Sequence, residues 1–225
     1  MSIKENIRTI IKELPPQTKL VAVSKFKPVE AIRQGYEAGQ RIFAESRPQE
    51  LKAKVEVLPK DIQWHFIGHL QTNKIKMVVP YVSLIHSVDS EKLLLEIADY
   101  CNRNGYKVSI LLEVFIASEE TKQGFSPHEV VDLLERVQSS QDLIERLRNV
   151  SISGLMGMAS FTDDMEQVKG EFQTLLDLNS RIKSLNYSFL ENFTELSFGM
   201  SNDYHIAAQM GSTMVRVGTS IFGSR

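Results

Sequence analysis

Lys25 is the residue of this 225-residue chain whose type and position point most directly to covalent chemistry. It ends the short apolar run 21–25, and a lysine amine at the end of a strand can attack a carbonyl to form a Schiff base. Side chains alternate between the two faces of a strand, so Val21, Val23 and Lys25 share one face. If that face points into a closed barrel, Lys25 stands at the carboxyl end, where barrel enzymes place their sites. The alternative is a solvated lysine at a strand end, as Lys27 would also be.

Two segments near the C-terminus combine glycine with hydroxyl-bearing residues. Ser201 follows Gly199 after one predicted strand, and Thr219 follows Gly218 after the next. Small residues let backbone N–H groups approach an anion closely, and barrels often bind phosphate with the loops after strands seven and eight. We therefore predict that Ser201, Gly218 and Thr219 hold a phosphate group. Each turn taken alone would be an ordinary loop sequence.

Arg216 shares a strand face with Gly218, which would place a guanidinium group inside the mouth of the barrel. A buried arginine is costly unless it is paired or faces an acceptor on a ligand. The alternative role is a structural ion pair with Glu45 or Glu113. Lys25 and the phosphate cradle together indicate a phosphorylated aldehyde held as a Schiff base, and Arg216 is a candidate for a further contact to that ligand.

The histidines give weaker signals. We predict that His69 contacts a ligand at the mouth of the barrel, whereas His65 reads as a core or rim residue and His86, His128 and His205 as ordinary polar residues. No spacing of histidine and carboxylate residues resembles a metal site. The sequence also contains neither a Gly-x-Ser-x-Gly elbow nor a phosphate-binding P-loop. We therefore predict no metal and assign no catalytic residue.

Eight short apolar or β-branched runs alternate with helical patterns, which is typical of parallel βα units. The predicted strands cover residues 20–23, 41–44, 64–68, 83–88, 108–114, 152–156, 195–198 and 214–217. Closing eight strands into a barrel removes the sheet edges. An open doubly wound sheet is the competing arrangement, but no Gly-x-Gly-x-x-Gly follows the first strand. We predict the α/β class and a (β/α)8 TIM-like barrel.

The segments between the predicted strands carry helix start signals. Ser126 can cap a helix whose first position is Pro127, and Glu129 can complete a capping box. A further amphipathic segment, residues 3–14, precedes the first strand. We predict that it forms an extra N-terminal helix covering part of the barrel.

Composition limits the classes of partner. Lys and Arg number 26 against 28 Asp and Glu, with pI ≈ 6.2, so no electrostatic field attracts nucleic acid or an anionic membrane. The single cysteine, Cys101, excludes an intramolecular disulfide and is compatible with a reducing compartment. No apolar run approaches the roughly 20 residues of a membrane helix, and the N-terminus lacks a signal-peptide pattern. We expect a cytoplasmic protein forming one domain over residues 1–225, with a small-molecule partner.

Six segments resemble, in order along the chain, the family of pyridoxal phosphate homeostasis proteins. They are residues 22–28, 43–50, 64–74, 154–156, 196–201 and 211–223. The resemblance implies a fold-type III barrel, similar to the N-terminal domain of alanine racemase, with pyridoxal 5′-phosphate (PLP) as cofactor. It implies that Lys25 is the Schiff-base lysine and that Arg216 faces the pyridine nitrogen. It also implies that Ser201, Gly218 and Thr219 hold the phosphate.

One departure from the family pattern concerns the residue after Glu45. The family usually carries Gly-Glu-Asn there, whereas this chain has Ala44, Glu45 and Ser46. Serine is shorter than asparagine and offers one hydroxyl instead of an amide. Ser46 is therefore a candidate for the asparagine's polar contact near the cofactor ring.

The leading interpretation is a monomeric PLP-binding protein that buffers the cofactor or delivers it to PLP-dependent apoenzymes, without significant turnover. By this resemblance it influences amino-acid and keto-acid balance. One alternative is a small amino-acid racemase, which needs two bases, one of them normally a tyrosine near the lysine. Here Val29 stands four residues beyond Lys25, and we expect no second domain to supply such groups. The other alternative is a class I aldolase-like barrel using Lys25 on a sugar phosphate, which should carry an acid or base beside its lysine.

Overall fold

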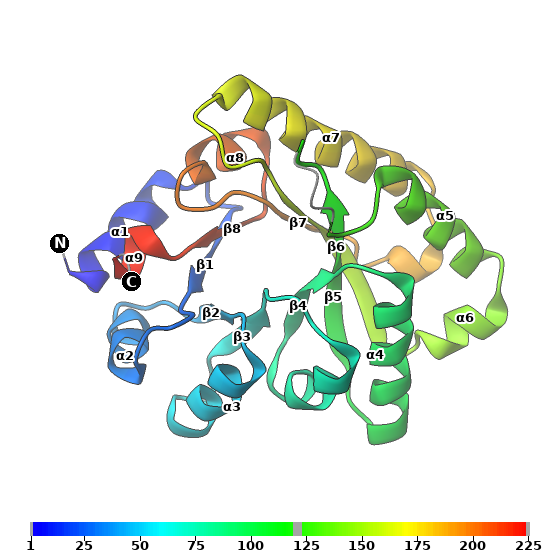
Figure 1. Ribbon diagram of the computed structural model, residues 1–225, viewed down its shortest axis with the longest axis horizontal. Coiled ribbons are helices and arrows are strands. Elements are labelled where there is room, and N and C mark those ends of the chain that lie inside the picture. Colours follow the sequence, from blue (N-terminus) through cyan, green and yellow to red (C-terminus); the bar gives the residue numbers. More distant parts are fainter. Residues whose placement is uncertain (1, 119–122, 224–225) are drawn as a thin grey trace.

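The computed structural model describes residues 2–118 and 123–223. Within these residues, eight parallel strands close into a barrel in which each strand pairs with the next and β8 pairs with β1 (Figure 1). The strands are β1 (Lys19–Val23), β2 (Ile42–Glu45), β3 (Gln63–Phe66), β4 (Leu84–Val88), β5 (Val108–Phe115), β6 (Val150–Met158), β7 (Glu195–Ser197) and β8 (Met214–Val217). The predicted (β/α)8 barrel is confirmed, and the largest difference in bounds is that β6 extends two residues further at each end.

Helices surround the barrel on its outer side (Figure 1). They are α1 (Ile3–Glu13), α2 (Val29–Glu37), α3 (Pro48–Val57), α4 (Glu91–Asn104), α5 (Pro127–Gln138), α6 (Gln141–Arg146), α7 (Met165–Ser184), α8 (Tyr204–Met210) and α9 (Thr219–Phe222). Three short 3₁₀ helices are also described: η1 (Thr72–Met77), η2 (Val79–Tyr81) and η3 (Ser188–Leu190). None of the described helices is both long and apolar enough to cross a membrane.

Two of the helix predictions rest on local sequence and are confirmed. The capping box at α5 is present, because Ser126 Oγ accepts from the Glu129 N–H at 3.2 Å and the Ser126 N–H donates to Glu129 Oε2 at 2.7 Å. The extra N-terminal helix is α1, which lies beside α9 (Figure 1). Asn6 Nδ2 donates to the Ile221 carbonyl at 2.9 Å and so joins the two chain ends.

Strand parity separates two apolar clusters. Leu20 and Ala22 face outward into the large core between barrel and helices. Val21 and Val23 face inward, where they meet interior residues of the other strands. Those interior partners are Ala44, Leu84, Leu111, Met156 and Met214. The inward face predicted for β1 is therefore confirmed, and it leads to Lys25.

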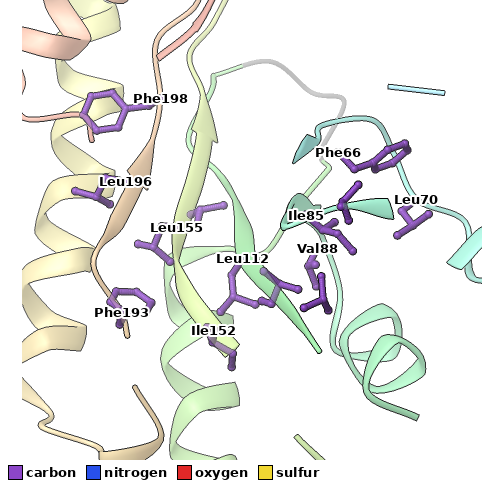
Figure 2. Packing of buried hydrophobic residues seen from close by; sticks show 14 of the residues in the cluster. Phe66, Leu70, Ile85, Val88, Leu112, Ile152, Leu155, Phe193, Leu196 and Phe198 are labelled. Carbon is purple, nitrogen blue, oxygen red and sulfur yellow. The ribbon is translucent and has the colours of Figure 1, made fainter. Parts of the chain in front are cut away.

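The outer core fixes the strands against the helices. Figure 2 shows Leu196 and Phe198 pointing from the β7 segment toward helix α7. The Phe198 ring lies 4.7 Å from the Phe172 ring of α7, measured between centroids, and both side chains are fully buried. Burying an aromatic side chain of this kind stabilises the fold by roughly 1.5–3 kcal/mol. This packing holds the β7 end, and hence the loop carrying Ser201, in place.

Candidate functional site

A cavity of about 290 Å³ opens at the carboxyl ends of the strands. Five of the seven predicted site residues line it: Lys25, Ser201, Arg216, Gly218 and Thr219. They follow or belong to three strands, β1, β7 and β8, that are neighbours around the barrel. Apolar side chains from β6 and the segment after it, among them Met156 and Met158, complete the wall. The parallel strand order therefore brings these residues into one hollow.

Lys25 is exposed at the mouth of the cavity, directly after β1. Its two neighbours are held by carboxylates of the next βα unit. Ser24 Oγ donates to Glu45 Oε1 at 2.6 Å, and the Phe26 N–H donates to Glu50 Oε2 at 2.8 Å. The backbone on either side of Lys25 is thus fixed, while its amine remains accessible to a ligand in the cavity.

The loops after β7 and β8 form the part of the cavity that suits an anion. The Gly218 N–H donates to Ser201 Oγ at 3.4 Å, which joins the two loops. In the part of the chain that the structure describes, the N–H groups of Ser201, Asn202 and Thr219 have no hydrogen-bond acceptor. A Cβ at position 218 would stand 3.1 Å from the Val23 carbonyl oxygen, so glycine allows the close approach of β8 to β1. Open N–H groups on small residues are what a phosphate requires.

Arg216 lies inside the barrel and is only 4 % exposed. Its Nη1 donates to the Ser197 carbonyl at 2.7 Å and to Ser197 Oγ at 2.6 Å, and its Nη2 donates to the Gly157 carbonyl at 3.0 Å. Among the described residues it forms no ion pair with Glu45 or Glu113, so the structural ion pair considered from the sequence is absent. Burial lowers the pKa of Arg216 to about 10, which leaves it cationic at neutral pH.

A chain of hydrogen bonds continues from Arg216 across the barrel. Ser197 Oγ accepts from Arg216, so its single proton is available for His86 Nδ1 at 2.9 Å. His86 Nε2 then donates to His65 Nδ1, also at 2.9 Å. Burial lowers the pKa of His65 to about 3 and that of His86 well below its usual value, so both rings are neutral. The hydrogen bonds thus run in one direction, from Arg216 to His65.

The sequence analysis missed this chain because it treated His86 as an ordinary polar residue. A signal was present, since His65 and His86 share strand faces with interior positions. His86 lies two residues after the inward-facing Leu84, and Leu84 pairs in register with His65. Applying the parity argument to β3 and β4, as was done for β1 and β8, would have placed both rings inside the barrel.

Strand β5 directs a carboxyl group, that of Glu113, into the barrel mouth. Glu113 is only 5 % exposed. Burial, together with the negative charge of Asp89, raises the pKa of Glu113 to about 7, although Arg216 and His69 act in the opposite direction. The carboxyl therefore changes its charge near neutral pH.

Ser46 and His69 do not line the cavity among the described residues. Ser46 is half-buried, and its backbone lies against Gly68, where a Cβ would collide with the Ser46 carbonyl. His69 is exposed, and its Nδ1 lies 3.0 Å from Asp89 Oδ2. Their contacts to a cofactor stay predictions. No group of three or more His, Cys, Asp or Glu side chains suited to a metal ion occurs in the described ranges.

Comparison with known proteins gives concordant matches. The family model described as the N-terminal domain of alanine racemase matches residues 1–225. A pyridoxal phosphate homeostasis protein of Aquifex aeolicus is 37% identical over 208 residues, covering 92% of this chain and 87% of the relative. PipY of Synechococcus elongatus, solved without PLP, is 34% identical with a TM-score of 0.89, covering 99% of this chain and 100% of PipY.

Two further structures extend the comparison. PipY with PLP bound superposes with a TM-score of 0.86 at 33% identity, covering 99% of this chain and 100% of PipY. An alanine racemase of Clostridium difficile superposes with a TM-score of 0.77 at 13% identity, and the match covers 100% of this chain and 56% of the racemase. The racemase likeness is one of fold.

Proposed function

The chain belongs to the pyridoxal phosphate homeostasis proteins, within the alanine racemase N-terminal domain family, and on that premise we propose that it binds PLP and buffers or delivers it in the cell. The observation that carries this proposal is the single cavity that gathers an accessible lysine, a buried arginine and small residues with open N–H groups. The relatives' names and the PLP-bound PipY structure support the same ligand.

The residues of the cavity fit PLP group by group. Lys25 offers a primary amine for the aldehyde, and Ser201 and Thr219 offer hydroxyl and open N–H donors for the phosphate. Gly218, whose N–H donates to Ser201 Oγ, joins the two loops and leaves room for the phosphate. Arg216 can only donate hydrogen bonds, which matches an unprotonated pyridine nitrogen. When bound, PLP supplies an aldehyde that condenses with amines and a ring that can withdraw electrons. We propose that Lys25 holds it as a Schiff base.

A carrier role is favoured over racemisation by the residues around Lys25. A racemase needs two bases placed on opposite faces of its substrate. No tyrosine lines the cavity in the described part of the chain, and Val29 stands four residues after Lys25. Arg216 can only donate hydrogen bonds, so it would leave the ring nitrogen unprotonated and the ring a weaker electron sink, which makes two well-placed bases the deciding requirement. The curated relatives are named as homeostasis proteins, which agrees with a protein that carries PLP without turning over amino acids.

Four narrower statements belong to the same proposal: one domain over residues 1–225, a monomer, a cytoplasmic location, and PLP-dependent apoenzymes as recipients. The barrel that closes β1 onto β8 supports the first. One cooperative unfolding transition, a monomer mass in sedimentation equilibrium and recovery in the cytosolic fraction would support the first three. Faster activation of an apo-aminotransferase by the loaded protein than by the same amount of free PLP would support the fourth, and equal rates would contradict it.

The central test is an absorbance spectrum of the protein with PLP, taken before and after borohydride reduction and followed by peptide mass mapping. We expect a yellow protein whose reduced adduct maps to Lys25, because a lysine imine extends the conjugation of the pyridine ring. Lys25→Ala should abolish the adduct, whereas Lys27→Ala, the nearest control, should retain it. An adduct on Lys27 or Lys74, with Lys25 unmodified, would refute the assignment.

The phosphate cradle is tested by comparing PLP with pyridoxal in an equilibrium titration. Charge-assisted hydrogen bonds to a phosphate contribute roughly 1.5–3 kcal/mol each, so pyridoxal should bind at least about tenfold more weakly. Equal affinities would exclude the cradle formed by Ser201, Gly218 and Thr219.

A further inference from the structure

We propose that Lys54, a buried lysine outside the cavity, is a positioning residue that fixes the backbone on both sides of Lys25. This inference rests on the proposed function, because it concerns how Lys25 meets the aldehyde of PLP. The residues involved are Lys54 and Glu50 of α3, Glu45 of β2, and Ser24 and Phe26, the two neighbours of Lys25. We refer to them as the Lys54 clamp.

Lys54 directs its ammonium group toward the β1–α2 loop, and only 8% of its side chain is exposed. The Nζ donates to Glu45 Oε1 at 2.7 Å, to the Ser24 carbonyl at 2.9 Å and to Glu50 Oε2 at 3.3 Å. An ammonium group has three donors, so these partners satisfy it completely. Lys54 is therefore held in one orientation.

The same two carboxylates hold the neighbours of Lys25. Glu45 Oε1 accepts from Ser24 Oγ at 2.6 Å, and Glu50 Oε2 accepts from the Phe26 N–H at 2.8 Å. Each neighbour is thus bonded to one carboxylate, and both carboxylates are bonded to Lys54. Lys25 lies between two anchored residues while its own side chain remains exposed.

The charges of the clamp are costly to bury. Burial raises the pKa of Glu45 although Lys54 and Ser24 oppose it, and Glu45 Oε2 is buried without a hydrogen-bond partner. For Glu50, burial acts to raise the pKa, but the Phe26 N–H and the charge of Lys54 outweigh it and lower the pKa. Apolar residues in place of a buried ion pair are often as stable or more stable. We therefore expect the clamp to act on the backbone conformation next to Lys25 and not mainly on the stability of the fold.

The backbone conformation that needs support is that of Phe26, whose φ is 63°. This left-handed conformation is unfavourable for a bulky residue. The hydrogen bond from its N–H to Glu50 holds the conformation, which turns the chain immediately after Lys25. With the backbone fixed on both sides, the Cα–Cβ bond of Lys25 keeps its direction into the cavity mouth. A shift of about 1 Å in a reacting group can slow a reaction roughly 100-fold.

The test compares Lys54→Met with the control Lys52→Met, since Lys52 is an exposed lysine on the same helix. Two ligands separate positioning from general damage: PLP, which reacts with Lys25, and pyridoxine 5′-phosphate, which has no aldehyde. We expect Lys54→Met to slow imine formation at Lys25 roughly 10- to 100-fold. Its affinity for pyridoxine 5′-phosphate should change less than about twofold, because the phosphate cradle does not contact the clamp. Lys52→Met should match the wild type with both ligands.

Ser24→Ala provides a milder variant should Lys54→Met fail to fold, because it removes only the hydroxyl bonds, to Glu45 Oε1 at 2.6 Å and to the Ala44 carbonyl at 3.4 Å. It should slow imine formation in the same direction and by a smaller factor. A parallel loss with both ligands, or no change in the rate with either variant, would overturn the proposal.

Amide hydrogen exchange on the ligand-free protein tests the clamp independently of PLP. The Phe26 N–H should exchange more slowly than the Lys25 N–H, for which the described residues provide no acceptor. Equal exchange at the two positions would also overturn the proposal. If the wild type binds neither phosphate compound, the proposed function fails, while the exchange result still decides whether the clamp forms.

Discussion

The orientations of the polar side chains inside the barrel are determined by their hydrogen-bond partners. Arg216 donates to Ser197 and Gly157, so the carbonyls at the ends of β6 and β7 determine its orientation. Ser197 donates a hydrogen bond to His86 Nδ1, which defines the tautomer of that ring, while burial lowers its pKa and keeps it neutral. A fixed cation at this point presents donors to an acceptor in the cavity without needing a carboxylate partner. The exception is Glu113, for which the described residues offer no hydrogen bond.

Glu113→Gln tests the protonation of that carboxyl in the ligand-free protein. Its pKa rises from 4.5 to about 7 on folding, so the unfolded state loses the proton first as pH increases. The free energy of unfolding of the wild type should therefore fall between pH 4.5 and pH 7 relative to the variant, by about 2–3 kcal/mol. Urea unfolding at pH 5 and pH 8 measures this difference.

The control for Glu113→Gln is Glu56→Gln, because Glu56 is exposed on α3. The pH dependence measured for Glu113→Gln is compared with that of this control. A constant difference for Glu113→Gln across the same range would contradict a buried carboxyl that ionises near neutral pH.

At the scale of elements, the turn between β7 and α8 carries a tightly constrained backbone. Gly199 has φ 93°, and a Cβ there would collide with the Cβ of Ala207 in α8. The Met200 N–H is held by Asp203 Oδ1, which also shapes the turn. These contacts leave little freedom in the path from β7 to Ser201. The position of Ser201, which is predicted to bind the phosphate, therefore depends on Gly199, two residues before it.

Gly199→Ala should destabilise the protein and weaken PLP binding, because the new Cβ must displace α8 or the Ser201 loop. We expect a cost of roughly 2–4 kcal/mol, from backbone strain and overpacking together. Gly211→Ala is the matched control, since Gly211 also has a positive φ, 105°, but nothing lies within 4 Å of its Cβ position.

The control Gly211→Ala should cost about 1 kcal/mol and leave PLP affinity unchanged. Thermal unfolding and equilibrium titration with PLP measure the two effects. Similar losses of affinity for the two variants would mean that strain alone, and not the collision with Ala207, governs the loop.

At the scale of the whole molecule, the closed barrel places its chemistry at one end. The cavity lies where the strands end at their carboxyl termini, and the helices cover the outer wall (Figure 1). The residues proposed to bind the aldehyde, the ring nitrogen and the phosphate come from β1, β8 and the loops after β7 and β8, which are neighbours around the barrel. A second base on the opposite face of a bound amino acid has no evident source among the described cavity residues.

The loaded protein should therefore not racemise amino acids at an ordinary enzymatic rate. Incubation with L-alanine in deuterated water, followed by NMR of the α-proton and chiral chromatography, measures this directly. We expect exchange far slower than about 1 s⁻¹, which is the low end of typical enzyme turnover. Exchange at that rate or faster would make the racemase alternative the better description.

The sequence by itself determined the barrel and the direction of its inward faces. Alternation along a strand has a period of two, so the shared face of Val21, Val23 and Lys25 could be deduced locally. The position of Arg216 followed from the same argument. Strand order in a parallel barrel then implied that loops after β7 and β8 meet near β1. For this reason five of the predicted site residues meet in one cavity.

Only the tertiary structure decided which polar groups are bonded to one another. The bond between Ser197 and His86 joins residues 111 positions apart, and that from Lys54 to Ser24 joins residues 30 positions apart. Such pairs depend on strand register, helix packing and the rotation of each side chain, none of which is encoded in local periodicity. Packing also decided that His69 contacts Asp89 and that Ser46 is not among the residues lining the cavity. Local sequence predicts the face on which a residue lies, and packing selects its partner.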